Sequence, residues 1–166
     1  MAKKKKSNLG KVFYAVALVL GIVAVAMLFV TAVKTPDTTV LGATVKGNTV
    51  SGLQLAFGYA EDEVARLGFS FMGLLPWLLT LAGTVVTLLN TLSKKGSALF
   101  DFVAVGTFIA AGVLFFLTPN FMIFADTIPG GILKAMDWKL AVGSIVAAIT
   151  SLLASVVVLA KNLSKN

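Results

Sequence analysis

The chain has 166 residues, of which 58% are hydrophobic and 13% are charged, and it contains no Cys and no His. A soluble domain is about 45–50% apolar and about 25% charged, so this composition indicates a membrane protein. The missing residue types exclude disulfides, thiol nucleophiles, imidazole bases and the usual soft metal sites. We therefore expect no cofactor, and a single domain over residues 1–166.

The formal net charge of +7 has a local source at the start of the chain, Lys3, Lys4, Lys5 and Lys6. A lysine cluster just ahead of an apolar run is typical of a topogenic signal, and it also attracts anionic lipid headgroups. We prefer membrane lipids over nucleic acid as the partner of this cluster.

Four long apolar runs predict four membrane spans, at residues 12–33, 67–92, 97–117 and 140–160. The first run would rise about 33 Å as a helix, enough to cross a hydrocarbon core of about 30 Å. A cleaved signal peptide is the alternative, because Val30-Thr31-Ala32 resembles a cleavage site. Signal peptides have shorter apolar regions of about 7–15 residues, which favours an uncleaved anchor. The predicted fold class is an all-α bundle of four transmembrane helices.

Orientation follows from the positions of Lys and Arg. If the N-terminus is cytoplasmic, the tails 1–11 and 161–166 and the turn after the second span carry nine of these residues. The two outer loops, 34–66 and 118–139, then carry five. This bias predicts a multi-pass protein of the cell membrane with both termini in the cytoplasm.

The first outer loop has the composition of a small β-structure. It repeats a Thr-Val pair three times, and Gly47-Asn48 suits a tight turn, which predicts a β-hairpin or small sheet. Beyond that turn, alternating apolar residues predict a strand with one apolar face. We expect this loop to be the partner-facing surface, with the candidate residues Val40, Val45, Gly47, Asn48, Leu53, Leu55 and Phe57.

The second outer loop is less polar than a free loop should be. Four consecutive apolar residues, 121–124, are followed by Pro129-Gly130-Gly131, a sequence that interrupts regular secondary structure. We expect this segment to lie at the membrane interface or to pack under the first loop. A re-entrant segment is the alternative, and it would need burial in protein to satisfy its backbone.

Small residues recur every four positions along the fourth span. Gly143, Ala147, Ser151 and Ser155 fall on one stripe, and helices in lipid associate through close packing of such residues. The stripe predicts a helix–helix contact, either within one chain, which we prefer, or between chains.

Chemistry within the spans is sparse. Asp101 is the only Asp, Glu, Lys or Arg inside a predicted span, and we interpret it as an interfacial carboxylate paired with Lys94 or Lys95. The alternative is an ion-coupling or proton-relay role. Pro76 predicts a kink in the second span. We expect no enzyme: membrane hydrolases need a nucleophile with a base, paired carboxylates or metal ligands, and a Ser–Lys pair needs a Lys at membrane depth, which the predicted spans lack.

The order of a short N-terminal tail, a span, a larger strand-forming outer loop and a smaller second one resembles the claudin and related tetraspan proteins in layout. The resemblance implies a small sheet in the first outer loop. The claudin loop pattern of Trp, Gly-Leu-Trp and paired Cys is missing from residues 34–66, so no functional residue is carried over. The short loops and the lysine cluster are more typical of a small bacterial membrane protein.

These features predict a non-enzymatic membrane protein that acts by protein–protein contacts, as a structural element or an accessory subunit. Other membrane proteins or a second copy of the chain are the expected partners. The alternative is a small transporter or channel component that works as an oligomer, with Asp101 and Pro76 as its functional residues. A lipid-interacting regulator held by the lysine cluster is a third possibility.

Overall fold

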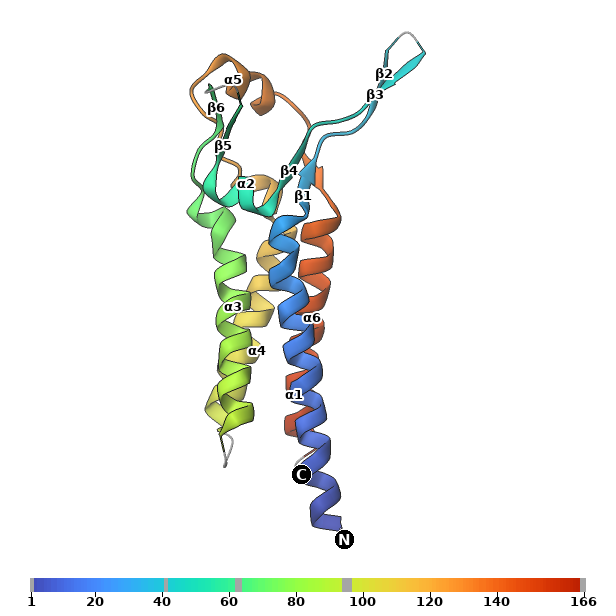
Figure 1. Cartoon of the computed structure of the whole chain (residues 1–166), viewed down its shortest axis with the longest axis vertical. Coiled ribbons are helices and arrows are strands. Elements are labelled where there is room, and N and C mark those ends of the chain that lie inside the picture. Colours follow the sequence, from blue (N-terminus) through green and yellow to red (C-terminus); the bar gives the residue numbers. More distant parts are fainter. Residues whose placement is uncertain (1, 41, 62–63, 94–96, 165–166) are drawn as a thin grey trace.

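The computed structural model describes residues 2–40, 42–61, 64–93 and 97–164, and the described chain is dominated by four long helices that form a bundle (Figure 1). Each helix contains a stretch long and apolar enough to cross a membrane. This confirms the predicted all-α fold of four membrane-length helices. The long helices are α1 (Ala2–Ala26), α3 (Phe71–Leu92), α4 (Ala98–Phe116) and α6 (Val142–Leu163).

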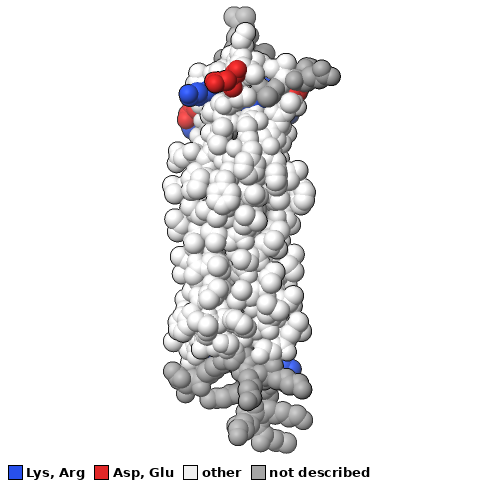
Figure 2. All heavy atoms as spheres, turned by 90° about the vertical axis from the view of Figure 1, so that its left-hand side faces the viewer, with Lys and Arg blue, Asp and Glu red and all other residues white. Residues whose placement is uncertain are grey.

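The two ends of the bundle differ. Helix α1 begins and helix α6 ends at one end, which we call the terminal end (Figure 1). The segments 27–70 and 117–141 gather at the other end and form what we call the cap. On the face shown in Figure 2, charged side chains lie at the two ends, and the long flank between them shows none. Such an uncharged flank is what contact with lipid tails requires.

The first span ends earlier than predicted. The apolar run continues to Val33, but α1 stops at Ala26 and a 3₁₀ turn, η1 (Met27–Phe29), leads into strand β1 (Thr31–Lys34). The β-branched residues after the turn find strand partners in the cap, and this pairing outweighs continuation of the helix.

The second and fourth spans also begin later than predicted. Leu67 belongs to strand β6 (Val64–Leu67), and α3 starts only after Ser70, whose hydroxyl accepts a hydrogen bond from Gly73 N at 3.0 Å. Such an N-cap marks where a helix can begin. Leu140 likewise lies in a strand, and α6 starts at Val142. Hydrophobicity alone did not separate the membrane helices from the apolar strands of the cap.

A three-stranded antiparallel sheet closes the cap above α1 and α6. Strand β1 pairs with β4 (Thr49–Ser51) on one side and with β7 (Lys139–Leu140) on the other. Because α1 leads into β1 and β7 leads into α6, the sheet ties the first and last helices together. Its Val33 and Val50 are fully buried against Leu55 and Leu67, which form the core of the cap.

A two-stranded hairpin, which we call the arm, projects from this sheet beyond the body of the protein (Figure 1). It consists of β2 (Thr38–Val40) and β3 (Ala43–Val45), and its turn contains Gly42 at φ +83°. A positive φ favours glycine. The predicted β-hairpin is therefore present, but its turn is at Gly42 and not at Gly47-Asn48.

Gly47 and Asn48 instead lie where the chain returns from the arm to the sheet. Asn48 N donates to Thr35 Oγ1 at 2.7 Å, and Thr35 N donates to Asn48 O at 2.9 Å. A β-carbon on Gly47 would lie 2.1 Å from Thr35 O, so the two backbone segments approach more closely there than any side chain would allow. The hydrogen bonds of these residues fasten the base of the arm.

The predicted strand through residues 53–57 is wrong, because Gly52–Phe57 is helix α2. Ser51 and Gln54 form a capping box: the Ser51 hydroxyl accepts from Gln54 N, and the Gln54 side chain accepts from Ser51 N at 3.0 Å. This reciprocal pair favours a helix start over an extended chain. Leu55 is buried, whereas Leu53 and Phe57 are exposed, so the three do not share one apolar face.

The second loop packs against the first, as one of the sequence interpretations predicted. Gly68 N donates to Ile123 O at 2.8 Å, and Leu67 forms an antiparallel bridge with Phe124. Its helix α5 lies at the far end of the cap and does not re-enter the bundle (Figure 1). The remaining cap elements are β5 (Tyr59–Glu61), which pairs with β6, η2 (Thr118–Phe121) and α5 (Ile128–Lys134).

The predicted small-residue stripe of α6 is buried inside the single chain. Ala147, Ser151 and Ser155 are at most 3% exposed, and Ser151 Oγ lies 3.4 Å from Thr80 Oγ1 of α3. Gly143 abuts the backbone of Thr31. Packing within the bundle therefore accounts for the burial of the stripe.

Candidate functional site: a buried polar cluster at the terminal end

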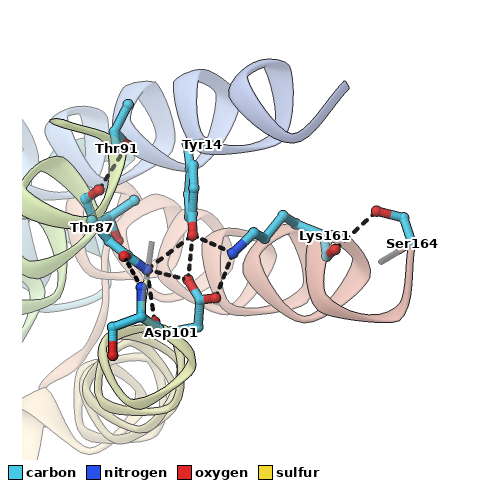
Figure 3. A network of polar contacts seen from close by, with 8 residues as sticks. Tyr14, Thr87, Thr91, Asp101, Lys161 and Ser164 are labelled. Carbon is cyan, nitrogen blue, oxygen red and sulfur yellow. Dashed lines mark hydrogen bonds and ion pairs between the residues drawn. The ribbon is translucent and has the colours of Figure 1, made fainter. Parts of the chain in front are cut away.

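Four polar side chains, one from each long helix, meet near the terminal end of the bundle (Figure 3). They are Tyr14 of α1, Asn90 of α3, Asp101 of α4 and Lys161 of α6, and each is at most 7% exposed. We call them the four-helix cluster. They are joined by direct hydrogen bonds and an ion pair, which links helices far apart in the sequence.

Asp101 is the acceptor at the centre of the cluster. Its Oδ2 lies 2.5 Å from Lys161 Nζ. Its Oδ1 accepts hydrogen bonds from the Tyr14 hydroxyl and from Asn90 Nδ2, both at 2.7 Å. Both oxygens of the carboxylate are therefore engaged, and the three donors come from three different helices.

Tyr14 connects the cation to the carboxylate. Its hydroxyl accepts from Lys161 Nζ and from Asn90 Nδ2, the latter at 2.9 Å, and donates its own proton to Asp101. Lys161 Nζ also lies 4.4 Å from the centre of the Tyr14 ring, where the ring face attracts a cation. The aromatic ring thus stabilises the ammonium group in addition to the hydroxyl contact.

Asn90 fixes the start of α4 next to the end of α3. Its Oδ1 accepts from Ser97 N at 2.6 Å, and its Nδ2 donates to Ser97 O at 3.0 Å. Ser97 is the N-cap residue of α4 and makes no side-chain cap bond of its own. The Asn90 amide therefore positions the first turn of α4, which carries Asp101.

Electrostatics favour both charges where they lie. Asp101 is in the first turn of α4, next to the positive end of that helix dipole, and Lys161 is in the last turn of α6, next to the negative end. An isolated buried charge costs several kcal/mol, whereas a pair with further hydrogen bonds offsets much of that cost. The pair brings one positive and one negative charge together, so their formal charges cancel.

The predicted surroundings of Asp101 need correction. The sequence predicts Lys161 in the cytoplasmic tail, but α6 continues to Leu163 and buries it. It is the ion-pair partner of Asp101, and it also shows that a Lys does lie within a membrane-length helix. The previously expected partners, Lys94 and Lys95, lie outside the described residues.

A sequence signal for Lys161 exists. The buried positions of α6 include Ala147, Ser151, Ala154 and Val158, and steps of three or four residues from them arrive at Lys161. A charged residue that continues a buried helical stripe should point into the bundle. The predicted span 140–160 ends before this first charge, whereas α6 extends through Lys161 to Leu163.

Pro76 does not belong to this cluster. It lies near the cap end of α3, and Asn90 follows it by 14 positions, which corresponds to about 21 Å of helix. Its carbonyl oxygen accepts a hydrogen bond from Thr80 Oγ1 at 2.9 Å. The two residues of the transport hypothesis, Pro76 and Asp101, are therefore at different levels of the bundle.

The candidate partner-facing residues are distributed over the cap. Val45 is 53% exposed on the arm, and Gly47 and Asn48 are at its base. Leu53 and Phe57 are exposed on α2. Leu55 is buried in the cap core and so is not available to a partner, and the side chain of Val40 lies outside the described part of the chain.

The fold defines a class of protein: a bundle of four membrane-length helices, closed at one end by small sheets and crossed at the other by a buried polar cluster. No protein-family model, no curated protein and no solved structure matches this chain.

Proposed function

We propose that this chain is a non-enzymatic, multi-pass protein of the cell membrane that acts by contacts with another membrane protein or a second copy of itself. The arm is the observation that carries the proposal. Its described side chains are exposed, and within the described part of the chain its two strands pair only with each other. An isolated two-stranded hairpin is marginally stable in water, and its free edges readily accept a further strand.

The orientation we propose places the cap outside and both termini in the cytoplasm. Burial of Lys161 removes one of the nine cations counted for the cytoplasmic side, which leaves eight against five. The bias keeps its direction, and the positive-inside rule still applies. In this orientation the lysine cluster Lys3, Lys4, Lys5 and Lys6, whose side chains lie outside the described part of the chain, would contact anionic headgroups of the inner leaflet.

The four-helix cluster serves, in this proposal, as a brace for the bundle and not as a reaction centre. Lys161 Nζ donates hydrogen bonds to Asp101 and Tyr14. An ammonium group in such contacts has no lone pair with which to act as a base or nucleophile. Its role would be to fix the four helices against one another and so hold the cap and the arm in place.

A small transporter or channel component is the second candidate function. Buried carboxylates within membrane spans often mark ion pathways or proton relays, and Asp101 is such a residue. It requires Asp101 to exchange its partners during transport. Flux across reconstituted vesicles that is abolished by Asp101→Asn, in protein that stays folded, would favour this candidate. We prefer the contact function over transport because of the exposed arm.

Site-specific photo-crosslinking in native membranes tests the proposal. A photoreactive residue at Val45 of the arm is compared with one at Leu88, which is exposed on the flank of α3. We expect crosslinks to protein from position 45 and to lipid from position 88. Absence of any protein crosslink from position 45 would contradict a contact function of the arm.

A further inference from the structure

We infer that the partner of the arm is the arm of a second copy of this chain, with strand β3 of one copy pairing antiparallel with β3 of the other. This inference rests on the proposed contact function and names its partner. It follows from the sequence of the strands, from the register in which they already pair, and from the charges around them.

The chain itself shows that its Thr-Val repeat is complementary to another copy of the repeat. Strands β2 and β3 each contain one Thr-Val unit, and they pair antiparallel with Thr39 opposite Thr44. Directly opposed Thr pairs stabilise antiparallel strands. Strand β3 therefore already accepts, on one edge, a strand of nearly its own sequence.

The same register can be repeated on the free edge of β3. If a two-fold axis passes midway between the two Thr44 residues, each Thr44 lies opposite the Thr44 of the other copy. Ala43 then lies opposite Val45 of the second copy. Lys46 then faces Gly42, so no like charges are opposed. Residues 38–45 carry no charge at all, so nothing in the strands themselves opposes self-pairing.

The free edge of β2 is less suitable than that of β3. Pro36 lies two residues before β2 and has no N–H to donate along that edge. Asp37 follows it, and its carboxylate is directed across the base of the arm, where it accepts from Gly47 N at 2.8 Å. The missing donor at Pro36 limits strand addition at β2, which leaves β3 as the pairing edge.

The absence of native Cys makes a direct test possible. The variant Thr44→Cys is crosslinked with a short thiol reagent in membranes, and Ile128→Cys serves as the control. The side chain of Ile128 is 84% exposed and lies elsewhere on the cap. We expect a crosslinked dimer from Thr44→Cys and several-fold less from Ile128→Cys. Equal yields at the two positions would overturn the inference, because they would report random collision.

A charge-swap experiment then tests the register. Two differently tagged copies that both carry Thr44→Lys should lose co-purification, because like charges would be directly opposed. One copy with Thr44→Lys and one with Thr44→Glu should regain it. Thr39→Lys, a matched change on the other strand of the arm, should leave co-purification intact. Failure of the opposite charges to restore co-purification would overturn pairing through Thr44.

The outcomes separate this inference from the proposed function. If the photoreactive residue at Val45 captures a different protein, and Thr44→Cys gives no dimer, the self-pairing inference fails and the contact function stands. If position 45 captures no protein of any kind, both fail.

Discussion

Lys161 Nζ lies 2.5 Å from Asp101 Oδ2, and the two side chains are 3% and 1% exposed. The pair joins the last turn of α6 to the first turn of α4, and both turns lie near the terminal end of the bundle. Tyr14 and Asn90 extend the contact to the other two long helices. Because every long helix contributes to this cluster, we expect the stability of the bundle to depend on it.

Asp101→Asn should destabilise the protein strongly. The substitution removes the carboxylate that faces the Lys161 ammonium and places amide hydrogens among existing donors. Breaking one side of a buried ion pair costs about 3–5 kcal/mol. Equilibrium unfolding in detergent measures this loss, and Asp126→Asn on the exposed cap, expected to change stability by less than about 0.5 kcal/mol, is the control.

Replacement of both partners should be much milder than replacement of one. Asp101→Leu combined with Lys161→Met removes both charges, and well-packed apolar replacements of buried pairs are often neutral or stabilising by about 1–4 kcal/mol. We expect the double variant to be more stable than Asp101→Asn. A double variant as unstable as the single one would show that the ion pair itself is indispensable to the fold.

The four helices and the β-hairpin of the first outer loop are predictable from the sequence, because long apolar runs indicate membrane-length helices and the Thr-Val repeat indicates strand propensity. The ends of the elements were not. Thr31 and Leu67 read as parts of apolar spans, and only strand pairing in the cap separates them from the helices.

The candidate site was only half predictable. Asp101 is conspicuous because it is a lone carboxylate in an apolar run. Hydropathy predicts Lys161 in the tail, because a charge normally marks the end of an apolar span. A tertiary contact determines where α6 ends, because a partner carboxylate 60 positions earlier allows the helix to continue through the lysine. Asn90 and Tyr14 were missed because uncharged polar residues do not interrupt an apolar run.

Tyr14→Phe should weaken the bundle by an intermediate amount. The change deletes a hydroxyl that donates to Asp101 and accepts from Asn90 and Lys161, while the ring remains over the ammonium. Removal of one partner from buried polar groups costs about 1–3 kcal/mol. Unfolding measurements check the value. Tyr59→Phe in the cap deletes the same atom away from the cluster, and a loss as large there would contradict a specific role for Tyr14.

Gly21→Ala should force α1 and α3 apart. A β-carbon at Gly21 would lie 2.3 Å from Thr84 Oγ1, and that hydroxyl is held by its own hydrogen bond to Thr80 O. Overpacking of this kind costs about 1–3 kcal/mol. Gly106→Ala is the matched control, since nothing lies within 4 Å of the added carbon.

The control variant should retain or slightly gain stability, because Ala favours helix over Gly by about 0.5–1 kcal/mol. Unfolding of the two variants side by side measures the difference. Equal stability of Gly21→Ala and Gly106→Ala would mean that the close approach of α1 and α3 contributes little to the bundle.

Crosslinking of the arm in the Asp101→Leu and Lys161→Met double variant tests most directly whether the function resides in the arm. In our proposal the arm makes the protein contact and the four-helix cluster braces the bundle. We therefore expect a photoreactive residue at Val45 to capture protein in native membranes as efficiently in the double variant as in the parent chain. Loss of that crosslink from a variant that remains folded would contradict this prediction, because it would show that protein contact by the arm needs the two charges themselves and not only a packed bundle.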